Sequence, residues 1–229
     1  MKGAAIPTDD LLGQPIVLVV ALALASLLPF AFVTVTAFVK IATVLQIVRG
    51  AIGAQNVPSS TIVMALAGAL TMLAMAPVTE RIAGRIRPLA SAKGAGDTVA
   101  LIQAGIEAVV PPVRDFLVAN ASEKERLRFL EVARSTRTVQ ERSEVQSTDL
   151  IVVVPAFLVT ELGEAFAAGF LIYLPFLVID LVVSNVLLAL GMQMMSPAPV
   201  SLPFKLLLFV AIDGWGLLAQ SLVTGYHAG

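Results

Sequence analysis

Long apolar stretches separated by short polar connectors set the pattern of this chain. Residues 15–48 hold one charged side chain, Lys40, in 34 positions. A straight helix of that length would measure about 51 Å, whereas the hydrocarbon core of a bilayer is about 30 Å thick. We expect the helix to break at Pro29, because proline removes a backbone hydrogen bond and clashes with the preceding turn. Beyond the break, four polar residues share one helix face: Thr36, Lys40, Thr43 and Gln46. That stripe fits either a hydrogen-bonded seam between helices or a surface facing a water-filled lumen.

A second apolar helix, residues 59–78, follows a turn rich in glycine and proline, and it completes a predicted helical hairpin. A similar pair stands near the C-terminus. It consists of residues 150–190, which we expect Pro155 and Pro175 to divide, and residues 202–223. The pattern therefore predicts two hairpins of broken helices.

The segment between the hairpins, residues 80–149, is polar and holds 11 of the 15 Lys/Arg and 10 of the 16 Asp/Glu residues. We expect an amphipathic helix that stops at Pro111–Pro112. A charged helix over residues 113–133 follows, in which Ser122 and Glu125 resemble a capping box. The chain thus divides into three segments of one integrated unit: residues 1–79, an N-terminal tail and the first hairpin; residues 80–149; and residues 150–229, the second hairpin.

The composition places the chain among integral membrane proteins. Hydrophobic residues make up 58% of it and charged residues 14%, too little polar surface to cover a soluble globule of this size. The net charge of −1 argues against nucleic-acid binding. Without cysteine there is no disulfide or thiol catalysis, and a single histidine, His227, leaves little for a metal site. No nucleotide-binding or hydrolase motif occurs, so we expect neither an enzyme nor a cofactor.

Besides Glu164, five charged side chains interrupt the apolar segments: Lys40, Glu161, Asp180, Lys205 and Asp213. Each would cost about 2.5–3.5 kcal/mol if it faced lipid. We therefore expect them to pair with one another, to line water, or to be buried between subunits. Either lysine could bond any of the three acids, and the sequence does not assign the pairs. Structural ion pairs inside an oligomer are the favoured interpretation, and a proton or ion relay through Asp180 is the alternative.

The connector of the second hairpin, Gly191–Pro203, holds three methionines at positions 192, 194 and 195. Methionine is flexible and ordinarily fills gaps in apolar cores, which is the simpler interpretation. Three methionines within four residues also form an adaptable apolar knob. Several copies around one axis would make a soft seal that could deform around a passing chain.

The second hairpin resembles the signature of the SctR/FliP family, inner-membrane export-apparatus proteins of bacterial type III secretion. The matching segments are GFLIYLPFLVIDLVVSNVLLALGMQMMSP and VSLPFKLLLFVAIDGW, with shorter matches in LLPF…FVK, RGAIGAQNVPS and VPAFLVTEL. Together they cover the first hairpin and residues 150–215, whereas the polar middle segment is not distinctive.

The resemblance implies an all-α membrane protein whose kinked helical hairpins assemble into a helical, cone-shaped oligomeric export gate. About five copies would join two smaller partners, the S/FliQ-like and T/FliR-like proteins, with much of the cone above the plane of the membrane. The gate would conduct unfolded secreted polypeptides across the bacterial inner membrane. Its gasket in the pore would be the methionine loop: Met192, Met194 and Met195.

Two departures from the family pattern bear on this expectation. Many members have a basic residue directly after the Thr-Glu-Leu motif, but Gly163 and Glu164 follow it here. A salt bridge between subunits through that basic residue therefore lacks its cation. Flagellar members usually carry a cleavable signal and a longer N-terminus, neither of which we find. We therefore expect the injectisome branch, SctR/YscR, which serves virulence, with a flagellar-type gate as the alternative.

The topology follows from the loops. Arg49 and Lys40 mark the first short connector as cytoplasmic. Four nominal spans then place both termini and the polar segment, residues 80–149, on the periplasmic side. Two other functions remain open at this point: an ion- or proton-coupled transporter with Asp180 as its relay, and a membrane scaffold without a pore.

Overall fold

The computed structural model describes residues 9–54, 57–91 and 98–227, and throughout these ranges the regular structure is helical. The prediction of an all-α fold is confirmed. The elements in chain order are α1 Asp9–Val35, α2 Phe38–Ile52, α3 Ser60–Ala74, α4 Ala76–Ser91, α5 Thr98–Asn120, α6 Glu123–Ser135, the short 3-10 helix η1 Glu141–Ser143, α7 Leu150–Ala189, α8 Pro197–Ala211 and α9 Gly214–Thr224. The division into three segments stays a prediction.

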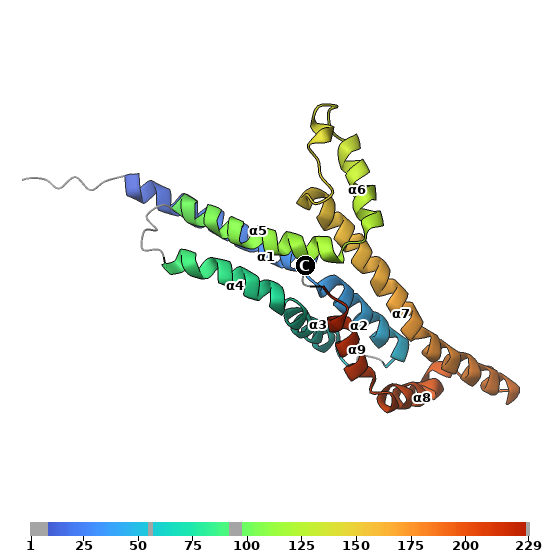
Figure 1. Ribbon diagram of the computed structural model, residues 1–229. Helices are drawn as coiled ribbons and strands as arrows, with labels where there is room; N and C mark the ends of the chain where they lie inside the picture. Colours follow the sequence, from blue (N-terminus) through green and yellow to red (C-terminus); the bar gives the residue numbers. More distant parts are fainter. Residues whose placement is uncertain (1–8, 55–56, 92–97, 228–229) are drawn as a thin grey trace, which may run out of the picture.

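Helix α7 is the spine of the molecule. It contains 40 residues and runs unbroken through Pro155 and Pro175, so it is about 60 Å long. The prediction that these prolines divide the segment is wrong. Proline is tolerated in an apolar helix when neighbouring helices hold the backbone in place. Here α2, α5, α6 and α8 all pack along α7 (Figure 1).

The two other proline predictions are also wrong. Helix α1 continues through Pro29 to Val35, and α5 continues through Pro111 and Pro112 to Asn120. In both cases the helix ends instead where a polar side chain offers the backbone a competing hydrogen bond.

Thr36 is that side chain at the end of α1. Its hydroxyl donates to the carbonyl of Phe32 and accepts the N–H of Phe38 at 3.3 Å. Such local bonds compete with the helical ladder. The axis turns by 68° here, between the end of α1 and α2.

Ser122 separates α5 from α6, where a single charged helix was predicted. The hydroxyl of Ser122 accepts the N–H of Glu125 at 3.3 Å, which is half of the predicted capping box. The carboxylate of Glu125 bonds Arg128 instead of reaching back. The N–H of Ser122 donates to the hydroxyl of Thr160 on α7 at 3.0 Å. The break therefore docks the base of α6 onto the spine, from which α6 projects as an arm (Figure 1).

Two more bends shape the apolar segments. Helices α3 and α4 meet at 57°, so the predicted helix over residues 59–78 is bent within its length. Helices α8 and α9 also meet at 57°, at Asp213. Within the described residues, α7 alone is long and apolar enough to cross a membrane. The number reaches four if each of the three bent pairs forms one span.

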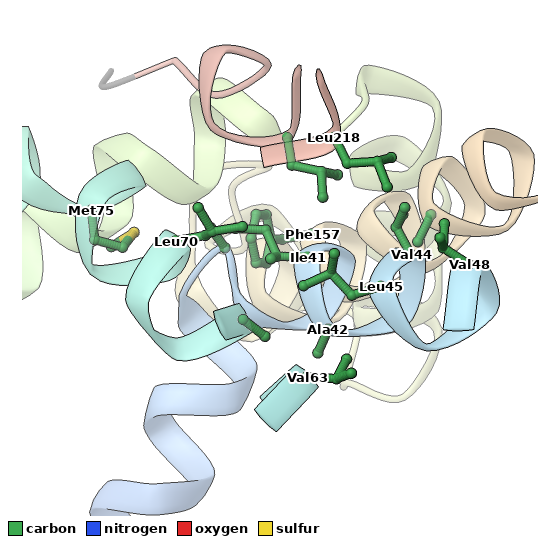
Figure 2. Close-up of a cluster of buried hydrophobic side chains, with 14 of the residues drawn as sticks. Ile41, Ala42, Val44, Leu45, Val48, Val63, Leu70, Met75, Phe157 and Leu218 are labelled. Atoms are coloured by element: carbon green, nitrogen blue, oxygen red, sulfur yellow. The ribbon is translucent and has the colours of Figure 1, made fainter. Parts of the chain in front are cut away.

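The core surrounds α2, which lies between α3, α7 and α9 (Figure 2). Each fully buried aliphatic or aromatic side chain there contributes about 1.5–3 kcal/mol by leaving water. The buried members drawn in Figure 2 come from all four helices: Ile41, Val44, Leu45 and Val48 of α2, Val63 and Leu70 of α3, Phe157 of α7 and Leu218 of α9.

The far end of α7 and the returning α8 carry apolar side chains that nothing in the described chain covers. In Figure 1 this hairpin extends away from the core. Its exposed residues include Leu181, Val182, Val186, Leu188, Leu190, Phe204, Leu207 and Val210.

Candidate functional site

A partly buried lysine joins α2 to α7. The ammonium of Lys40 lies 3.1 Å from Glu161 Oε1 and 2.6 Å from Glu164 Oε2. The side chain of Glu161 is 1% exposed and that of Glu164 is 56% exposed. Glu161 and Glu164 are three residues apart and share one face of α7, which is why one cation reaches both. Glu164 thus contributes to a charge cluster from which the predicted site left it out.

Tyr226, just beyond α9, completes this cluster and was not predicted. Its hydroxyl donates to the carboxylate of Glu161, and its ring lies 4.6 Å from the Lys40 ammonium. The ring also stacks on Phe116 of α5 at 5.9 Å between centroids. Burial, reinforced by the charge of Glu161, raises the pKa of Tyr226, so the phenol stays protonated and can donate. The only signal in the sequence was an aromatic residue with a polar tip after the last apolar segment.

A second lysine, Lys205 of α8, ties the far hairpin to α2. Its ammonium lies 2.6 Å from Asp180 Oδ2 on α7 and 3.2 Å from the carbonyl of Ala51. The Ser201 hydroxyl donates to the other oxygen of Asp180 at 2.6 Å. Ala51 belongs to the last turn of α2, where carbonyls lack helical partners and the helix dipole favours a cation. Lys205 therefore fixes three helices at one point.

The structure thus assigns the pairs that the sequence left open, Lys40 with Glu161 and Lys205 with Asp180, and both lie within one chain. The expectation that these charges also contact other subunits stays a prediction.

Asp213 is placed differently. It is exposed and makes no ion pair among the described residues. Its backbone is left-handed, with φ of 51°, and it starts α9. Aspartate tolerates that conformation better than most residues, and its carboxylate lies near the helix N-terminus, against Gly216. Within the described chain, its position is that of a hinge residue.

The three methionines lie in the connector at the tip of the α7–α8 hairpin. Gly191, with φ of 75°, ends α7, and Met192, Met194 and Met195 follow it, all exposed to solvent. Met194 is fully exposed and fills no gap in the described chain. Met192 and Met195 line an open groove of about 360 Å3 that also includes Leu187 of α7.

A larger apolar groove of about 420 Å3 runs between the two arms of the same hairpin. Its lining is aliphatic and aromatic: Val178, Ile179, Val182, Val183, Val186, Leu187, Val200 and Phe204. Among the described residues, no group of three His, Asp or Glu side chains is arranged to hold a metal. The site therefore offers apolar contacts at the tip of the α7–α8 hairpin, and ion pairs hold the base of the hairpin to the core.

Comparison with known protein families matches residues 21–222 to the FliP family. The chain belongs to the FliP family. The match spans both hairpins and the polar segment between them, so the resemblance seen in the sequence motifs is confirmed.

Individual relatives agree with this assignment. This FliP-family chain is 40% identical over 210 residues to the hypersensitivity response secretion protein HrcR of Ralstonia nicotianae, which is 92% of this chain and 96% of the relative. It is 39% identical over 209 residues to the Yop proteins translocation protein R of Yersinia pestis, with coverages of 91% and 95%. The flagellar biosynthetic protein FliP of Caulobacter vibrioides is 42% identical over 206 residues, which is 89% of this chain and 73% of that protein.

These names describe components of type III secretion and flagellar export. The relatives named for secretion by pathogens cover most of the chain and identify the injectisome branch, SctR. The chain is therefore similar to components of protein-secretion and flagellar export systems.

Proposed function

We propose that this FliP-family chain is a pore-forming subunit of the type III secretion export apparatus, which conducts unfolded proteins across the bacterial inner membrane. About five copies would join the S/FliQ-like and T/FliR-like proteins in a cone. The observation that carries this proposal is the α7–α8 hairpin, which ends in exposed methionines and leaves its apolar flanks uncovered.

The uncovered flanks support burial between subunits. An apolar surface of this extent marks a protein or membrane contact. The Lys205–Asp180 pair and its bond to Ala51 hold the hairpin at a set angle to the core. A rigid arm of this kind presents its tip reproducibly, so several copies would bring the same tip to one axis.

The methionines support a pliable seal at that axis. Methionine side chains have three rotatable bonds and adapt to irregular apolar surfaces. In an empty pore, a ring of Met192, Met194 and Met195 from several copies would pack together and close the opening. The same side chains would move aside for an extended polypeptide of any sequence.

The proposed topology is multi-pass. The first connector, after α2, would face the cytoplasm, and both termini with residues 80–149 would face the periplasm. The bent pairs and α7 supply up to four spans for this arrangement.

Site-specific crosslinking tests the pore. The chain contains no cysteine, so Met194→Cys introduces a unique thiol. In the assembled apparatus with a stalled substrate, Met194→Cys should crosslink to that substrate. Val139→Cys, at an exposed position beyond α6, should not. A substrate crosslink at both positions or at neither contradicts the proposed gasket.

The oligomer needs a separate measurement. Native mass spectrometry of gently solubilised complexes should show several copies together with other small membrane proteins. If only the monomer were detected under conditions that keep the apparatus intact, the proposal of a pore built from several copies would be wrong.

The alternative function, an ion- or proton-coupled transporter, assigns the relay to Asp180. Asp180 already bonds Lys205 and Ser201, which favours a structural role. Asp180→Asn separates the two: a relay predicts normal assembly without transport coupling, whereas a structural pair predicts failure to assemble.

A further inference from the structure

The C-terminal residues 225–227 return to the centre of the molecule. After α9 the chain turns back, so that Tyr226 and His227 lie against Ala37 between α1 and α2 and against Asn120 at the end of α5. Tyr226 holds this segment through its hydroxyl and its ring, and His227 holds it through two backbone hydrogen bonds to the side chain of Asn120.

The backbone contact is reciprocal. The side-chain amide of Asn120, at the end of α5, donates to the carbonyl of His227 at 2.8 Å and accepts its N–H at 3.0 Å. The ring of Tyr226 stacks on Phe116 of the same helix. The tail is therefore attached to α5 at two successive residues.

The phenol contacts the other two elements. Its oxygen bonds the carboxylate of Glu161 on α7 and lies 3.2 Å from the carbonyl of Ala37. Ala37 stands at the 68° bend between α1 and α2. A phenol carries one proton, so it can donate to the carboxylate or to the carbonyl, and not to both at once.

The contact of Tyr226 also affects how the neighbouring charges pair. Glu161 is buried and relies on two partners, Lys40 and Tyr226. Lys40 is in turn shared with the exposed Glu164. If the tail left, Glu161 would keep Lys40 alone, and the buried acid would draw the lysine away from Glu164.

We propose that Tyr226 and His227 form a C-terminal strap that fixes the bend between α1 and α2 against α7 by sharing the Lys40–Glu161 pair. Release of the strap frees the bend and shifts Lys40 from Glu164 towards Glu161. The strap is a conformational device of the single chain, and it holds whether or not the chain forms a pore.

Distances between spin labels test the strap in the full-length protein in detergent. Leu28→Cys on α1 and Leu171→Cys on α7 are exposed positions in a chain without cysteine. The strap predicts a narrow distance distribution for the parent pair. Tyr226→Phe, Asn120→Ala and a chain ending at Gly225 should each widen or shift it.

Tyr173→Phe is the matched control, because Tyr173 is the other tyrosine and its hydroxyl has no hydrogen bond within the described residues. It should leave the distribution unchanged. Where the truncated chain does not fold, Tyr226→Phe carries the test, since it keeps the ring and removes only the hydroxyl.

Glu164→Gln separates a strap from simple packing. The substitution removes the competing carboxylate, so that Lys40 can pair with Glu161 alone. The double variant Tyr226→Phe/Glu164→Gln should therefore show a narrower distribution of spin-label distances than Tyr226→Phe alone. Loss of ring packing would not be rescued in this way. Parent-like distributions in all three tail variants, or no effect of Glu164→Gln on Tyr226→Phe, would overturn the proposal.

Discussion

Lys40 and Lys205 each make more than one bond, and this sharing decides what a substitution does. Lys205 neutralises Asp180 and also satisfies the carbonyl of Ala51 at the end of α2. Removing one partner of a buried pair leaves an uncompensated charge, which costs far more than the pair itself contributes. At the residue scale, each lysine therefore connects several helices, and its removal destabilises the packing of all of them.

Lys205→Met should destabilise the protein by roughly 3 kcal/mol. This value is at the lower end for a broken buried pair, because the Asp180 side chain is 30% exposed and keeps some water. Denaturant unfolding in detergent measures the change. The double variant Lys205→Met/Asp180→Leu should recover most of it, because no unpaired charge remains. Equal losses in the single and double variants would assign the effect to packing.

Asp213 should respond to backbone shape rather than to charge. Asp213→Asn and Asp213→Gly tolerate the left-handed conformation and should change stability little. Asp213→Ala should cost about 1–2 kcal/mol, because alanine has the Cβ strain of the left-handed conformation without the short polar side chain that lets aspartate and asparagine adopt it. Thermal unfolding of the three variants checks this order. If Asp213→Asn were the most damaging, Asp213 would belong to an ion pair with another chain.

At the scale of elements, the close approach of α2 and α7 depends on small residues. The sequence pairs Ala165 with Gly169 on one face of α7, and both are buried in the structure. A Cβ added at Gly169 would lie 2.5 Å from Cδ1 and 3.0 Å from Cγ2 of Ile47 on α2. A contact of 2.5 Å is shorter than real Cβ contacts, so the Ile47 side chain or one of the two helices would have to move.

Gly169→Ala should therefore destabilise the protein by about 1–3 kcal/mol, the usual cost of overpacking. Gly163→Ala on the same helix meets nothing within 4 Å, and should be neutral or stabilising because alanine favours a helix. Unfolding midpoints compare the two. Gly169→Ala/Ile47→Ala should regain part of the loss, and its failure to do so would locate the strain elsewhere.

At the scale of the whole molecule, the chain divides into a packed centre around α2 and a hairpin whose apolar surface is exposed. The centre explains how one chain holds its shape. The exposed hairpin offers an apolar surface to a membrane or to other chains, and the proposed function uses it for contact with other chains.

Val210→Asp tests that division. Val210 on α8 is 74% exposed, and Val139 beyond α6 is 75% exposed, so Val139→Asp is a control matched in residue type and exposure. Both variants should unfold within about 0.5 kcal/mol of the parent chain, as surface substitutions do. Val210→Asp alone should reduce co-purification with other export-apparatus proteins. An equal effect of both variants would place the assembly surface elsewhere.

The sequence by itself determined the features that depend on residue type and on spacing between near neighbours. Long apolar stretches, the polar middle and the methionine connector follow from residue type and spacing, so the all-α class, the hairpins and the family signature could be predicted. The pairing of charges could not, because Lys40 and Glu161 are 121 residues apart and no local rule joins them. Tyr226 became part of the site only because the chain end folds back onto α5 and α7.

The breaks of the helices show the same limit. Proline predicted breaks at Pro29, Pro155 and Pro175, yet the helices continue through all three positions. The chain breaks instead at Thr36, Ser122 and Asp213, where a side-chain bond or a left-handed backbone competes with the helix. The sequence by itself set which segments are helical and apolar. The tertiary structure decided which charges meet, because the paired residues are far apart along the chain.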